Sequence, residues 1–128
     1  MRDLSHNLGV RNALSPAVQA ATIKGNAIDT KGFNSVAFVV NTGAIVSDGD
    51  FTATLQHSDT SVDGDFVDVT AADQTGAFPA SLAADSAAKA GYIGNRRYAR
   101  VVLTKNGGTS IAAGAVAVLG QAADRPVA

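Results

Sequence analysis

The sequence has few of the residue types from which many functional sites are built. Its 128 residues include no cysteine, no tryptophan and only two histidines. The absence of cysteine excludes disulfide bonds, thiol catalysis and thiolate metal ligands in this chain. The first residues lack the apolar segment of a signal peptide, and no apolar run reaches the roughly 20 residues that span a membrane. We therefore expect a protein that is made and used without secretion and has no membrane partner.

Charged residues are scarce as well. They make up 16% of the chain, and the formal net charge is −1. The only basic block is Arg96-Arg97, whereas binding to phosphates requires many lysines and arginines on one face. We therefore predict no nucleic-acid partner. Hydrophobic residues reach 46%, which indicates a folded domain because disordered chains combine low hydrophobicity with high charge.

The chain is rich in signals for β-strands. Phe51–Ser58 alternates apolar and polar residues, which predicts a strand with one buried face. Ser35–Asn41 is apolar along most of its length, and we expect a central strand covered on both sides. Turn pairs such as Asp63-Gly64 separate these segments, and no long amphipathic helix competes with them. Further strands are expected at Phe66–Thr70, Ala88–Ile93, Tyr98–Lys105 and Ile111–Leu119. The pattern predicts an all-β fold, an antiparallel, jelly-roll-like β-sandwich.

The expected organisation has three parts. Residues 1–25 form an extended N-terminal arm with a possible first strand at Ala17–Ile23, residues 26–120 form the sandwich, and residues 121–128 form a tail. Within the sandwich, Ala71–Lys89 is expected to cross from one sheet to the other, with one helical turn at Ser81–Ala84. The arm carries large apolar residues without a helical period, and we expect them to contact a partner: Leu4, Leu8, Val10 and Leu14. Deleting residues 1–14 is expected to leave the sandwich folded.

Three groups of residues are candidates for chemistry or recognition. His57 is interpreted as a strand-end side chain at the rim of the core rather than as a catalytic base. The acidic segment Asp59–Asp68 lacks the ligand spacing of an EF-hand loop, so it is interpreted as a solvated hairpin loop. No catalytic, metal-binding or cofactor-binding residue is therefore predicted. For the arginines two readings remain open, which are contact with a partner's carboxylates and pairing with the acidic loop of the same chain: Arg96, Arg97 and Arg100.

Several stretches carry a resemblance to a known group of proteins. They are the pattern LxxxxxVRNALSP from Leu4 to Pro16, GxxSVAFVVNxGAI from Gly32 to Ile45, FTATLQHSD from Phe51 to Asp59, YIGNRRYARVVLT from Tyr92 to Thr104 and SIAAGAVAVLG from Ser110 to Gly120. These stretches resemble small head proteins of tailed phages and prophages that are encoded near the major capsid protein. The resemblance implies a structural protein of the virion, and it brings no catalytic residues.

The leading hypothesis is a capsid decoration, or cement, protein on the outer surface of the head. Such a protein would be made in the host cytoplasm, and its partners would be the major capsid protein and further copies of itself in a homotrimer. A component of the neck or tail is the alternative within the virion. A carbohydrate-binding module is a third hypothesis, which the lack of tryptophan disfavours.

Overall fold

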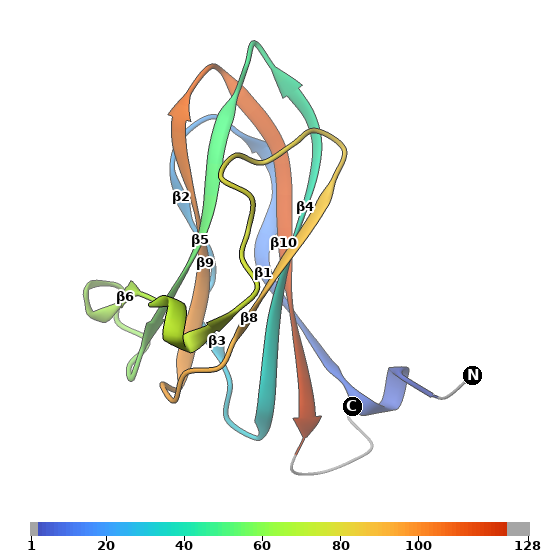
Figure 1. Ribbon diagram of the computed structural model, residues 1–128, viewed down its shortest axis with the longest axis vertical. Helices are drawn as coiled ribbons and strands as arrows, with labels where there is room; N and C mark the ends of the chain where they lie inside the picture. Colours follow the sequence, from blue (N-terminus) through green and yellow to red (C-terminus); the bar gives the residue numbers. More distant parts are fainter. Residues whose placement is uncertain (1–2, 123–128) are drawn as a thin grey trace.

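The computed structural model describes residues 3–122, which form two antiparallel β-sheets packed face to face (Figure 1). Sheet A has the strand order β1-β10-β4-β8-β7, and sheet B has the order β2-β9-β5-β6, with β3 also paired to β9. The predicted antiparallel sandwich is confirmed. The strands are β1 (Gly9–Gln19), β2 (Ile23–Lys24), β3 (Ile28–Asp29), β4 (Phe33–Val46), β5 (Asp50–Ser58), β6 (Val67–Asp68), β7 (Gln74–Thr75), β8 (Ala87–Tyr92), β9 (Tyr98–Gly107) and β10 (Ser110–Ala122). Three short 3-10 turns accompany them: η1 (Ser5–Asn7), η2 (Asp63–Asp65) and η3 (Ala71–Asp73).

The order of the strands is that of a jelly roll. Strands β2 and β3 lie one after the other along β9, where Ile23 is opposite Leu103 and Ile28 is opposite Ala99. They act as two halves of one strand, and β7 is a short addition beyond β8. Eight strands remain when β2 and β3 count as one and β7 is set aside. In chain order, β1, β10, β4 and β8 of sheet A are then the first, eighth, third and sixth strands. In sheet B, β2/β3, β9, β5 and β6 are the second, seventh, fourth and fifth. Two sheets wound in this way leave few long unpaired edges.

The core lies between the sheets and follows the alternation of side chains along the strands. On β5, Phe51 and Leu55 are buried while Thr54 is exposed, as the sequence predicts. All residues of strand β9 from Ala99 to Leu103 are buried. Its outward-facing residues are therefore covered as well, unlike those of most strands in a sandwich with solvent on its outer faces.

Strand β4 differs from the expectation. Its inward residues Val36, Phe38 and Val40 are buried, whereas Ala37 and Val39 on the other face are only half-buried. The prediction that this strand is covered on both sides is therefore wrong. An apolar run alone does not show whether its second face meets a layer of the same chain, and here that face is open.

The N-terminal region is shorter as an arm than the sequence suggests. β1 pairs with β10 from Gly9 to Gln19, and it places Leu14 in the core. Register shifts flank Leu14, where Ser15-Pro16 interrupts the pairing because proline has no N–H to donate. The expected boundary at residue 25 is therefore not a boundary of the fold, and a deletion through Leu14 would remove part of the core. Strand β10 continues to Ala122, so the expected tail begins within a strand, and residues 123–128 lie outside the described part.

The segment before β8 crosses between the sheets as predicted, since β6 belongs to sheet B and β7 and β8 to sheet A. The expected helical turn at Ser81–Ala84 is absent from this described segment. Leu82 instead enters the core, and its N–H donates to the carbonyl of Phe51 at 2.9 Å. The hydroxyl of Thr42 donates to the carbonyl of Ala83 at 2.5 Å. Burial of one leucine outweighs a single helical turn, whose nucleation is unfavourable.

Candidate interaction surface

The outer face of sheet A, which points away from sheet B, is built from small and apolar side chains. On β4 and β10 the outward positions alternate with the core residues, and they are Ala37, Val39, Asn41, Ala112, Gly114, Val116 and Val118. Lys89 on β8, opposite Val39, brings one charge to this face. Solvated faces of antiparallel sheets are usually polar. This face is therefore an exposed apolar surface, and surfaces of this kind often mark a site of contact with another molecule.

A groove of about 770 Å³ runs along this face. Strand β1 forms one wall, β4 and β10 form the floor, and Ala87 stands on the side of β8. No charged residue and no aromatic residue lines it: Asn12, Pro16, Ala17, Val18, Val39, Asn41, Thr42, Gly43, Ala87, Ala112, Ala113, Gly114, Ala115 and Val116. The floor passes close to the wall at Gly114, where a Cβ would lie 3.0 Å from the Cα of Pro16 and would force a shift of a few tenths of an ångström. The wall and the floor are thus in direct contact.

Two asparagines supply polar groups to the groove. Asn12 comes from β1, and its Nδ2 donates to the hydroxyl of Ser15 at 3.1 Å. Asn41 comes from β4 and is exposed. An amide side chain both donates and accepts hydrogen bonds, which suits the N–H and C=O groups of a peptide main chain. The absence of aromatic platforms among the lining residues disfavours a glycan as the occupant.

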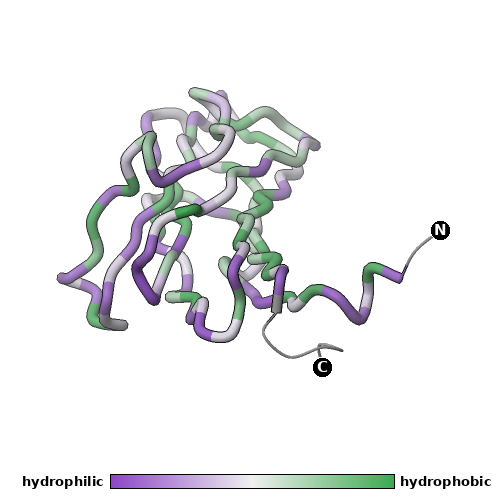
Figure 2. The backbone as a smooth tube through the Cα atoms, turned by 60° about the horizontal axis from the view of Figure 1, so that its bottom comes forward, coloured by the Kyte–Doolittle hydropathy of each residue, from purple (hydrophilic) through white to green (hydrophobic). Residues whose placement is uncertain are grey.

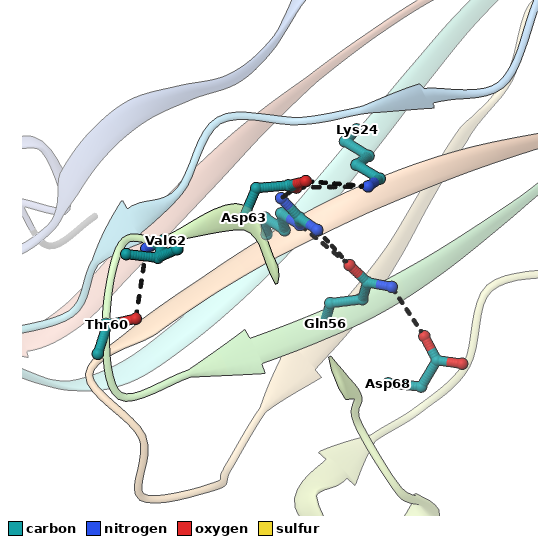
Figure 3. Close-up of polar contacts among 7 residues, drawn as sticks. Lys24, Gln56, Thr60, Val62, Asp63 and Asp68 are labelled. Atoms are coloured by element: carbon teal, nitrogen blue, oxygen red, sulfur yellow. Dashed lines mark hydrogen bonds and ion pairs between the residues drawn. The ribbon is translucent and has the colours of Figure 1, made fainter. Parts of the chain in front are cut away.

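The outer face of sheet B is organised differently, around Arg100. This side chain is buried on β9, and its Nε and Nη2 donate to Oε1 of Gln56 at 3.0 and 2.7 Å. Its Nη1 donates to Oδ1 of Asp63 at 2.6 Å (Figure 3). The guanidinium also lies over the ring of Phe66, with Cζ 4.1 Å from the ring centroid. The loop after β5 therefore folds back and covers this face.

The same contacts extend to the neighbouring strands. Gln56 donates through Nε2 to Asp68 on β6 at 3.0 Å, and Lys24 on β2 approaches Asp63 at 3.3 Å (Figure 3). The hydrogen bonds from Arg100 and Lys24 hold the pKa of the Asp63 carboxyl below its usual range. Three carboxylates of the acidic loop, Asp63, Asp65 and Asp68, thus accept hydrogen bonds from side chains of the same chain.

Two of the three arginines pair with carboxylates of their own chain. Arg100 pairs with the acidic loop of its own chain, and Arg97 donates through Nε and Nη2 to Asp29 at 3.0 and 2.8 Å. That contact lowers the pKa of Asp29 to about 2. Arg100 thus fits the interpretation as a partner of the acidic loop, whereas Arg97 pairs with a carboxylate on β3, outside that loop. Arg96 is half-buried, and its backbone N–H donates to the Tyr92 hydroxyl at 3.0 Å.

His57 lies at the rim of the core, as predicted. Its Nδ1 is 2.9 Å from the hydroxyl of Tyr92, and the two rings meet edge to face. Because His57 is on β5 and Tyr92 is on β8, this hydrogen bond joins the two sheets. Burial lowers the pKa of His57 and raises the pKa of Tyr92. The neighbouring Ser58 accepts a bond from the N–H of Thr60, so its hydroxyl serves the loop.

Within residues 3–122, no three histidine or carboxylate side chains come together in a way that could hold a metal ion. No helix in that range is long and apolar enough to cross a membrane.

The four apolar residues predicted as arm contacts fall into different environments. Leu4 is 68% exposed and Val10 is 53% exposed, whereas Leu8 is half-buried and Leu14 lies in the core. Leu14 is therefore not available to a partner in the folded chain. Residues 3–8, before β1, extend from the sandwich, and both Figures 1 and 2 show this segment leading away from the body of the molecule.

Sequence reasoning missed the groove. Its signal was the uncharged character of the outward positions on β4 and β10, such as Val39 and Gly114. In Ser35–Asn41 on β4 this character was interpreted as burial on both sides. The contribution of Pro16 and Val18 to the β1 wall of the groove could not be predicted from the sequence for another reason. It depends on the pairing of β1 with β10, more than 90 residues away along the chain.

No protein-family model and no curated protein matches this sequence. Among solved structures, a chain in the structure of infectious bursal disease virus, Gx strain, matches 93% of this chain with a TM-score of 0.51 and 16% identity. A chain in the structure of the Gt strain of the same virus matches 98% with a TM-score of 0.42 and 15% identity. This chain spans 34% of the length of each viral chain. At this identity the likeness to the Gx chain shows a shared fold.

Proposed function

We propose that this protein is a non-enzymatic structural protein of a virus particle, and more specifically a decoration protein on the outside of a phage head. It binds the major capsid protein and bridges neighbouring capsid subunits. The observation that carries the proposal is the match of nearly the whole chain to part of a chain from a virus structure. The resemblance of the sequence to small phage head proteins points in the same direction.

The surface supports a role in protein contact. Fold alone does not define function, because jelly rolls occur in viral capsids, lectins and cupins. Here the outer face of sheet A is apolar and almost without charge, and its groove lacks the aromatic platform of a glycan site. Surfaces of this composition are used for binding other proteins.

Self-association is part of the proposal. Closed symmetric oligomers are the rule among soluble assemblies, and a trimer matches the local threefold positions of a capsid. A homotrimer made in the host cytoplasm would bind the assembled head and stabilise it by linking capsid subunits that meet at such a position.

Copy number in purified particles tests the proposal. We expect quantitative mass spectrometry of virions from the source virus or prophage to find this chain in hundreds of copies per particle. About a dozen copies or fewer would instead assign it to the neck or tail. Its absence from purified particles would refute a role in the virion.

A further inference from the structure

We propose that the groove on the outer face of sheet A binds residues 3–8 of a second copy of this chain. The inference deepens the proposed self-association, although it does not depend on a virus particle. Three observations carry it, which are the position of the segment, the chemistry of the groove and the exposure of Leu4.

The segment and the groove lie at opposite ends of the same sheet. β1 begins at Gly9, opposite Leu119, whereas the groove extends along β1 from Asn12 to Val18. The chain before Gly9 therefore leaves in the direction opposite to the groove, and Figures 1 and 2 show it leading away from the sandwich. This geometry presents the segment to a neighbouring molecule rather than to its own groove.

The segment contains the short turn η1 and is held by hydrogen bonds between its own residues. Asp3 accepts hydrogen bonds within the segment, from the ring of His6 at 2.6 Å and from Nδ2 of Asn7 at 2.7 Å to its carbonyl. Its polar side chains are thus largely satisfied before any partner binds. Leu4 is 68% exposed, which leaves a large apolar side chain in water on the free molecule.

The groove matches such an occupant. Its lining carries no charge, its floor is made largely of small and apolar side chains, and Val116 and Val18 contribute exposed apolar surface to it. A leucine can pack on this floor while Asn12 and Asn41 bond the main chain of the incoming segment.

The contact is directional, since one copy gives the segment and the next gives the groove. Such head-to-tail contacts produce rings when the rotation closes and filaments when it does not. A six-residue segment buries less surface than a standard interface, so one contact alone is weak. A closed ring supplies one contact for every copy and holds each chain at both ends, which favours a small ring such as a trimer.

Two charge substitutions test the contact from its two sides. Leu4→Asp alters the segment, and Val116→Asp places a carboxylate in the groove at a position that is 38% exposed. Each should weaken association at least about tenfold in sedimentation velocity runs on the full chain, because an unpaired charge is costly to bury. Val67→Asp is the matched control on β6, outside the groove and 49% exposed, and it should associate like the unmodified chain.

Mixing the two variants gives the decisive measurement. The Leu4→Asp chain retains an intact groove and the Val116→Asp chain retains an intact segment, so one contact can form between them. Their equimolar mixture should therefore associate more than either variant does alone at the same total concentration, although less than the unmodified chain. Circular dichroism confirms that each variant is folded. An unmodified chain that stays monomeric at about 100 µM, variants that associate normally, or a mixture that associates no more than the separate variants would each overturn the proposal. A chain that is monomeric yet abundant in virions would leave the proposed function standing and refute only this contact.

Discussion

The two outer faces of the sandwich have opposite designs. On sheet B, the loop after β5 covers β9 and sets Arg100 between Gln56, Asp63 and Phe66. On sheet A, no segment within residues 3–122 covers the floor of the groove, which is built from residues such as Gly114 and Val39. The first face is completed by its own chain, and the second is apolar and open.

The comparison shows that most of the conspicuous charged residues of this protein stabilise the fold, whereas the open face is nearly uncharged. The arginines attract attention in the sequence because charged residues are rare, yet two of the three are used to hold the fold. The open face has almost no charge and is therefore inconspicuous in the sequence. In a protein of small side chains, the surface available to a partner is defined by what its own chain leaves uncovered.

The largest effect is expected at the wall of the open face. Leu14→Ala removes a core side chain that is 4% exposed, and we expect the free energy of unfolding to fall by about 2–5 kcal/mol. Leu4→Ala, in the projecting segment, should change it by less than about 0.5 kcal/mol. Urea denaturation followed by circular dichroism measures both. Equal effects would contradict the division of the N-terminal region at Gly9.

This division shows where sequence reasoning stops. The strands with clear alternation, such as Phe51–Ser58, were predictable because the order of apolar and polar residues within each strand shows which side chains are buried. The place of Gly9–Gln19 was not, because Pro16 interrupts the pattern and its partner strand is Ser110–Ala122 at the far end of the chain. The same long-range pairing creates the groove, so the candidate site could not be found from local patterns.

The second effect sharpens the comparison by opening the covered face. Arg100→Ala removes three hydrogen bonds and the packing on Phe66, and leaves Gln56 without its donor. We expect a loss of about 2–3 kcal/mol in the free energy of unfolding, because hydrogen bonds to charged groups contribute most when they are buried. Val116→Ala, on the open face, should cost less than about 0.5 kcal/mol. If the two variants unfold at the same urea concentration, the side chains of the two outer faces contribute equally to stability, and the contrast between the covered and the open face is wrong.

A smaller effect is expected at Asp63, which contacts Arg100 but is itself exposed. Its lowered pKa means that the folded chain favours the charged carboxylate. The resulting stability is present above the usual pKa of about 3.9 and is lost as the pH falls through the lower folded value. Asp63→Asn should therefore be less stable than the unmodified chain at pH 7, with a difference that narrows below about pH 4 and in 1 M salt. Asp65→Asn is the control in the same loop, because that carboxylate bonds the Thr60 hydroxyl instead of a cation.

The smallest effect is expected at the hydrogen bond between His57 and Tyr92, which joins the two sheets inside the sandwich. Burial lowers the pKa of His57, so the folded chain resists protonation while the unfolded chain takes up a proton near pH 6.5. Between that value and the lower folded pKa the unfolded state binds more protons, and stability must fall as the pH falls. His57→Gln keeps a polar side chain beside Tyr92 but cannot titrate. We expect the stability of the unmodified chain to decline relative to the variant when urea denaturation is repeated at pH 7.5, 6.0 and 5.0. Carboxylates that titrate in both proteins cancel in this difference, so a constant difference across the three pH values would show that His57 is accessible to protons in the folded state. Abundance in virions should not change, because His57 lies inside the sandwich and away from the open face.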